Sequence, residues 1–217
     1  MERSLVPLSG RVMTGNATSR ISGFKSFARF CCLGLLVAGL EEFITQGVLK
    51  RTYAGWILPT LIAFLPFLVI VRIAWTLLDR LLPEPASILG HYMIGGTLGL
   101  MVEWFLIGLS PWRDPQAPIL ALLGFQAGMF SFWGSVALIP RILLDTRASV
   151  SRSRRLVLRF AGTGGILVYI LTFTIPERAR FWTVILAVLT VFLSLNFAYF
   201  QYLKALRKTG LPDASSH

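Results

Sequence analysis

The sequence predicts an all-α, polytopic membrane protein with six transmembrane helices. The chain of 217 residues is 55% hydrophobic and only 14% charged, whereas a soluble domain is about a quarter charged. Six apolar segments recur, each close to the roughly 20 residues that cross a bilayer core. We expect residues 1–29 to form a polar, basic tail, residues 30–203 the transmembrane domain, and residues 204–217 a second tail.

Each apolar segment is expected to be a helix, because unpaired backbone polar groups are costly in lipid. The predicted spans are Phe30–Leu49, Trp56–Leu78, Ile88–Leu109, Pro118–Ile139, Val157–Ile175 and Phe181–Leu203. The first span has an alternative, because Glu41 and Glu42 interrupt it. A helix over Ile21–Leu40 would move both glutamates from the middle of the membrane to its outer interface.

Basic residues set the expected orientation of these helices. Of the 21 Lys and Arg residues, 15 fall on the side of the two termini and 5 on the other side. The positive-inside rule then places both termini in the cytoplasm. We expect a multi-pass protein of the bacterial inner membrane, with an organellar membrane as the alternative. The run Arg152-Ser153-Arg154-Arg155 is expected to attract anionic lipid, at about 1 kcal/mol per charge.

The net charge of +11 does not predict a nucleic-acid partner here, because the basic residues lie between apolar runs. Cys31 and Cys32 are adjacent, which supports neither a disulfide framework nor a metal site. His91 and His217 do not form a haem or zinc pair. The sequence therefore predicts no cofactor and no metal.

Short matches in the sequence indicate an internal repeat. Leu77-Leu78-Asp79 matches Leu143-Leu144-Asp145, Gly96–Val102 matches Gly162–Val168, and Leu33–Val37 matches Leu98–Val102, all at a spacing of 65 or 66 residues. These matches predict three helical hairpins in parallel orientation, an arrangement that occurs in transporters. The alternative is chance, since strings of Leu, Gly and Val are common in spanning helices.

Polar residues inside the spans are the strongest pointers to function, because a charge at the bilayer centre costs about 2.5–3.5 kcal/mol. Glu42, Gln46 and Lys50 are spaced four residues apart and form one polar stripe on a helix. Adjacent residues are about 100° apart, so only one of Glu41 and Glu42 is expected to face a shared interior. The candidate substrate- or ion-binding residues are Glu41, Glu42, Gln46, Arg72, Glu103, Gln126 and Asn196.

These residues support three functions from different classes. The first is a small transporter or channel in which buried carboxylates line a polar cavity. The second is an intramembrane enzyme that uses a buried glutamate as general acid or base on a lipid or isoprenoid substrate. The third is a non-catalytic subunit of a membrane complex, or a homo-oligomer, packed through small residues. The candidate contacts are Gly95, Gly96 and Gly99, or Gly162, Gly164 and Gly165. The structural alternative pairs Glu103 with Lys50 or Arg51, and lets Arg72 extend to the lipid headgroups.

One short string resembles a known family. The residues Glu41-Glu42-Phe43-Ile44-Thr45-Gln46-Gly47 resemble Glu-Glu-x-x-x-Arg-Gly, the first motif of the CAAX-protease-like intramembrane glutamate proteases. Gln46 stands where that family has arginine, and its later histidine motifs are not evident. The resemblance therefore names no catalytic residue for this chain.

Overall fold

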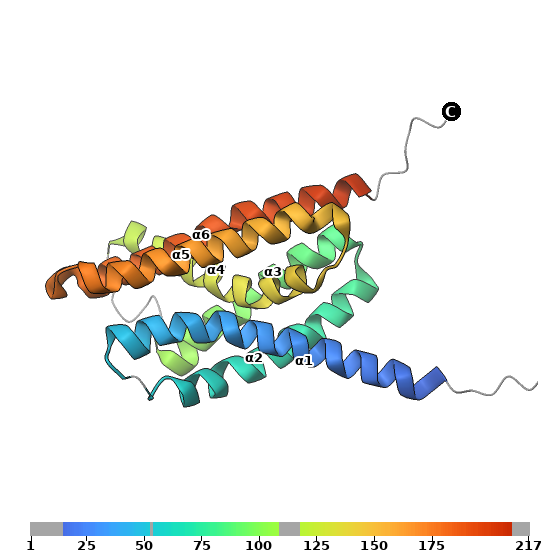
Figure 1. Cartoon of the computed structure of the whole chain (residues 1–217), viewed down its shortest axis with the longest axis horizontal. Helices are drawn as coiled ribbons and strands as arrows, with labels where there is room; N and C mark the ends of the chain where they lie inside the picture. The colour runs from blue at the N-terminus through green and yellow to red at the C-terminus, as the bar shows by residue number, and fades with distance from the viewer. Residues whose placement is uncertain (1–14, 53, 109–117, 210–217) are drawn as a thin grey trace, which may run out of the picture.

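The computed structural model describes residues 15–52, 54–108 and 118–209, and it folds them into a bundle of helices (Figure 1). No strand occurs in these three ranges, so the all-α prediction is confirmed for them. The elements in chain order are α1 (Gly15–Glu42), the π-helix η1 (Phe43–Leu49), α2 (Ile57–Leu81), α3 (Glu84–Met101), the π-helix η2 (Val102–Ile107), α4 (Ile119–Leu144), the 3₁₀ turn η4 (Ala148–Val150), α5 (Ser151–Thr174) and α6 (Glu177–Thr209).

Four of the six long helices are long and apolar enough to cross a membrane. The candidate spans are Thr60–Leu81, Ile119–Leu144, Ala148–Thr174 and Glu177–Arg207. The prediction of a multi-pass membrane protein is therefore supported at this level. α1 and α3 are not among the four.

α1 is longer than the sequence predicted. It begins at Gly15, inside the segment that we expected to be a polar tail, and runs to Glu42 before η1 continues to Leu49. No proline lies within residues 15–49, so nothing removes a backbone donor from the helical ladder. Both predicted versions of the first span lie within this one continuous stretch.

α4 forms the centre of the bundle and packs against each of the other five long helices. All residues from 131 to 142 are buried, and the Trp133 side chain is fully so. Its indole stacks on Phe64 of α2 with the ring centroids 4.6 Å apart. α3 comes close enough because Gly99 lies against Trp133, where an added Cβ would stand 1.9 Å from Cγ of the indole.

The start of α1 and the end of α6 lie at the same end of the bundle (Figure 1). The α2–α3 and α4–α5 connections also lie there, while η1, η2 and the α5–α6 connection lie at the opposite end. This arrangement separates two groups of charged residues. The end with Asp79, Glu84, Arg141, Asp145 and Arg147 is called the paired end below, and the end with Glu41, Glu42 and Glu103 the glutamate end.

Candidate functional site

The glutamate end is built on two π-helical turns. α1 changes to η1 directly after Glu42, and α3 changes to η2 one residue before Glu103. A π-helical turn is wider than an α-helical turn and is found frequently at functional sites. Glu41 and Glu42 thus end α1 directly before one π-helical turn, and Glu103 lies within the other.

Glu103 is buried, with 5% of its surface exposed. Its Oε1 accepts a hydrogen bond of 3.0 Å from Nε1 of Trp133. No Lys or Arg among the described residues forms an ion pair with it, so the alternative that pairs Glu103 with Lys50 or Arg51 is not found. The carboxylate is held by a neutral donor that leaves its charge uncompensated.

Glu41 and Glu42 lie close enough to Glu103 for the three carboxylates to interact electrostatically. Gln46 and Lys50 both lie close enough to Glu42 to affect its carboxyl group, and Lys50 acts on both α1 glutamates from beyond ion-pair distance. The site therefore gathers three carboxyl groups that have no ion-pair partner among the described residues.

Glu41 also lines an apolar cavity of about 80 Å³ between α1, α4, α5 and α6. Its walls are aliphatic and aromatic side chains together with two glycines of α5, Gly164 and Gly165. Glu41 is the sole charged side chain in this lining. The sequence predicted a polar cavity with Glu42 and Glu103 in its wall, and neither of these two residues lines the apolar cavity found here.

The two polar amides of the prediction lie elsewhere. Gln126 of α4 accepts a hydrogen bond of 2.8 Å from Nε1 of Trp104, the residue next to Glu103. Asn196 of α6 joins Tyr92 and Ser131 in a network between α3, α4 and α6, with the Tyr92 hydroxyl donating to Oδ1 of Asn196 at 2.6 Å. Gln126 thus supports the glutamate end, and Asn196 holds helices together.

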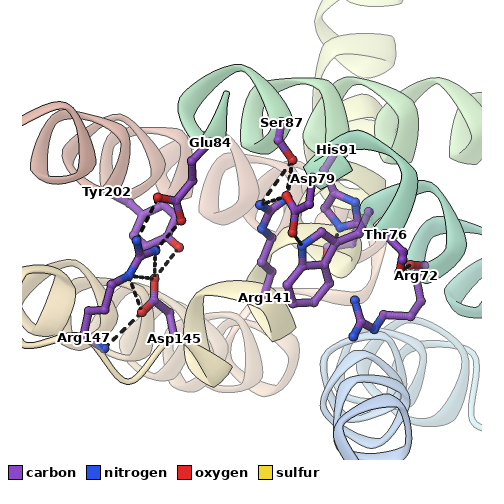
Figure 2. Close-up of polar contacts among 12 residues, drawn as sticks. Arg72, Thr76, Asp79, Glu84, Ser87, His91, Arg141, Asp145, Arg147 and Tyr202 are labelled. Atoms are coloured by element: carbon purple, nitrogen blue, oxygen red, sulfur yellow. Dashed lines mark hydrogen bonds and ion pairs between the residues drawn. The ribbon is translucent and has the colours of Figure 1, made fainter. Parts of the chain in front are cut away.

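The paired end contains a network that the sequence did not single out (Figure 2). Asp79 accepts hydrogen bonds on Oδ1 from Arg141 at 2.7 Å and from the Ser87 hydroxyl, and on Oδ2 from Nε1 of Trp75 at 2.5 Å. The Arg141 guanidinium also lies 4.7 Å from the centre of the Trp75 ring. Both Asp79 oxygens are therefore occupied. The partners are up to 62 residues apart in the sequence, a separation that local spacing does not reveal.

A second network at the paired end surrounds Asp145 (Figure 2). Arg147 bridges Asp145 and Glu84, with its Nη2 2.6 Å from Oε1 of Glu84, and the Tyr202 hydroxyl donates to Asp145 at 2.7 Å. Burial raises the pKa of Asp145, but the hydrogen bonds from Arg147 and Tyr202 outweigh it and hold the pKa below its ordinary value. The hydrogen bonds that Arg147 donates to Asp145 and Glu84 raise the pKa of Arg147.

Arg72 lies near the first network and takes no part in its ion pair. Its guanidinium stacks 4.0 Å from the centre of the Trp75 ring and 5.8 Å from that of Phe30 in α1. A cation–π contact contributes about 0.5–2 kcal/mol, which does not exceed the roughly 2.5–3.5 kcal/mol that an arginine costs inside a membrane. Stacking alone therefore leaves the charge of Arg72 incompletely compensated.

Two glycine-rich stripes, predicted as contacts for a protein partner, have different surroundings. Gly95 and Gly99 pack on α4 of the same chain. On α5, a Cβ at Gly164 would meet Val191 of α6, whereas one at Gly162 would meet nothing within 4 Å. The first stripe is therefore used within the bundle.

The described residues contain no group of three His, Cys, Asp or Glu side chains that is arranged to hold a metal ion. Cys31 and Cys32 are both free thiols. A comparison with family models, with curated proteins and with solved structures found no match. The function proposed below is therefore argued from the residues at the two ends of the bundle.

Proposed function

We propose that this protein is a small membrane transporter in which Glu41 exchanges a proton for a cationic or polar group of its solute. The observation that carries the proposal is the position of Glu41, alone among charged side chains in an otherwise apolar cavity. A carboxylate in such surroundings favours binding of a proton or of another cation, because burial disfavours its bare charge. Binding of one then competes with binding of the other, which couples the two movements.

The neighbouring carboxylates strengthen this reading. Glu42 and Glu103 interact electrostatically with Glu41, so loss of a proton from one group makes loss from the next harder. The set offers a short chain of proton acceptors that leads from the end of the bundle to the cavity. Proton pathways through membranes use buried carboxylates in this way.

The size of the cavity limits the solute in this conformation. A volume of about 80 Å³ is well below the roughly 300–1,000 Å³ of pockets that enclose a drug-sized ligand. The cavity admits a small headgroup or part of an alkyl chain. A larger solute requires α1 and α5, which stand on either side of the cavity, to move apart.

The number of membrane spans, their orientation and the internal repeat are part of the same proposal. α1 and α3 would complete six spans, and the paired end, which carries the excess of Arg and Lys, would face the cytoplasm of a bacterial inner membrane. The two Leu-Leu-Asp triplets support a repeated hairpin, because each aspartate lies at the end of a long helix and accepts hydrogen bonds from an arginine and an aromatic residue.

The proposal is tested in liposomes that contain the purified protein and an internal pH-sensitive dye. A panel of small alkylammonium ions and amino acids is added outside, and proton movement is recorded for the wild type, Glu41→Gln and Glu177→Gln. Glu177 is exposed at the start of α6 and serves as the matched control. We expect at least one solute to move protons in the wild type and the control, and a decrease of at least about tenfold in Glu41→Gln. Wild-type liposomes that move neither solute nor protons contradict the proposal.

An intramembrane enzyme is the second candidate, and the apolar lining of the cavity is the observation that favours it. A lipid chain would fit these walls, and a protonated Glu41 would act as general acid. Native mass spectrometry of protein from its own membrane separates the candidates. A retained lipid that is converted by the wild type and not by Glu41→Gln favours the enzyme, whereas a stoichiometric protein partner favours a subunit of a complex.

A further inference from the structure

The guanidinium of Arg72 has unused hydrogen-bond donors. A guanidinium group carries five N–H donors in one plane. Its Cζ lies over the rings of Trp75 and Phe30, and neither of these side chains has an oxygen or nitrogen atom that accepts a hydrogen bond from an N–H group. Among the described residues, no acceptor hydrogen-bonds the Arg72 guanidinium and no carboxylate forms an ion pair with it.

The nearest carboxylate is already occupied. Asp79 uses Oδ1 for Arg141 and Ser87, and Oδ2 for Trp75. Arg72 and Arg141 both lie over the Trp75 ring, and of these two guanidinium groups that of Arg141 is paired with Asp79 and that of Arg72 is not. The local charge is positive, although the side chains lie on a candidate membrane span.

The part of α1 that lies near Arg72 carries no acidic residue. Phe30 of α1 packs on the Arg72 side of α2, and residues 24–40 of α1 contain no Asp or Glu. The same stretch carries Lys25 and Arg29, both exposed. On α2, Ile70 and Ile73 flank Arg72 in the sequence and are 52% and 55% exposed, as expected for residues in contact with lipid chains.

We propose that Arg72 binds a phosphate group at the junction of α1 and α2. The planar fork of an arginine matches two oxygens of a phosphate, and such hydrogen bonds are strong because both partners are charged. The phosphate can belong to the headgroup of a membrane lipid whose chains lie along Ile70 and Ile73, or it can be free in solution. This site is separate from Glu41, so it stands independently of the transport proposal.

Native mass spectrometry in mild detergent tests the site with three probes. They are dioleoylphosphatidylglycerol, dioleoylglycerol, which has the same chains and no phosphate, and inorganic phosphate. We expect the wild type to bind one molecule of the phospholipid and Arg72→Gln to bind it at least about tenfold more weakly. Arg80→Gln, an exposed arginine on the same helix, is the matched control and should bind like the wild type.

The probes also identify the source of the phosphate. Binding of the phospholipid without competition from inorganic phosphate assigns a lipid headgroup, whereas competition by inorganic phosphate assigns a free anion, and both support the site. Arg72→Lys keeps the charge without the fork and should bind with intermediate strength, which provides a folded variant if Arg72→Gln does not fold. Equal binding of dioleoylglycerol, or unchanged phospholipid binding in both Arg72 variants, overturns the proposal.

Discussion

At the paired end, Asp79 and Asp145 each accept hydrogen bonds from an arginine and from an aromatic side chain. At the glutamate end, Glu103 accepts a hydrogen bond from the neutral Trp133, and Glu41 lines an apolar cavity. The same chemical group, a carboxyl group, is thus paired with arginine at one end of the bundle and has no ion-pair partner among the described residues at the other. The first group joins helices through ion pairs and hydrogen bonds, whereas the second has no ion-pair partner among the described residues, which supports the proposal that it binds a solute or a proton.

The largest stability effect should come from breaking the network around Asp79. Asp79→Asn leaves Arg141, which is 5% exposed, without its charged partner. Loss of one member of a buried ion pair costs about 3–5 kcal/mol, and the 44% exposure of the Asp79 side chain lowers the expected cost to about 2 kcal/mol. Chemical unfolding in detergent measures the change. Stability within about 0.5 kcal/mol of the wild type would show that the pair is not structural.

A smaller effect should follow acidification at the same end. Because hydrogen bonds from Arg147 and Tyr202 hold the pKa of Asp145 below its ordinary value of 3.8, its ionised form stabilises the folded state at higher pH. This contribution is present above about pH 4 and is lost as the pH falls through the lower folded-state pKa. Arg147 is 42% exposed, so the contribution is about 1 kcal/mol.

The acid effect is measured as the stability difference between the wild type and Asp145→Asn. The difference should be present at pH 7 and should shrink as the pH is lowered below 4. A difference that stays constant from pH 7 to pH 3 would show that the charge of Asp145 is not its source.

The smallest effect is expected at the glutamate end. Glu103→Gln keeps a carbonyl oxygen that can accept the hydrogen bond from Trp133, and it removes a buried charge that no described cation contacts. Its free energy of unfolding should lie within about 1 kcal/mol of the wild type, or slightly above it. A loss as large as that of Asp79→Asn would contradict the distinction between the two ends.

The sequence predicted the helical class, because hydropathy and the helical period indicate it, and the polar stripe of Glu42, Gln46 and Lys50 stays a prediction. Glu41 was one of the candidate residues, but the apolar cavity beside it was not predicted, since the face of α1 that meets α5 and α6 depends on packing. The sequence did not indicate that Asp79, Ser87 and Arg141 form one network. Arg141 was counted only among the basic residues that set the orientation of the helices. The contacts of this network join three helices, and no local spacing encodes them.

The difference between the paired end and the glutamate end is tested most directly by labelling with dicyclohexylcarbodiimide. This apolar reagent modifies carboxyl groups that are able to hold a proton in apolar surroundings. Protein in its native membrane is treated at neutral pH, digested and mapped by mass spectrometry. The account predicts modification of Glu41 in the apolar cavity, and none of Asp79 or Asp145, whose oxygens are held by arginine and aromatic donors. Labelling of Asp79 or Asp145 with Glu41 unmodified would contradict it.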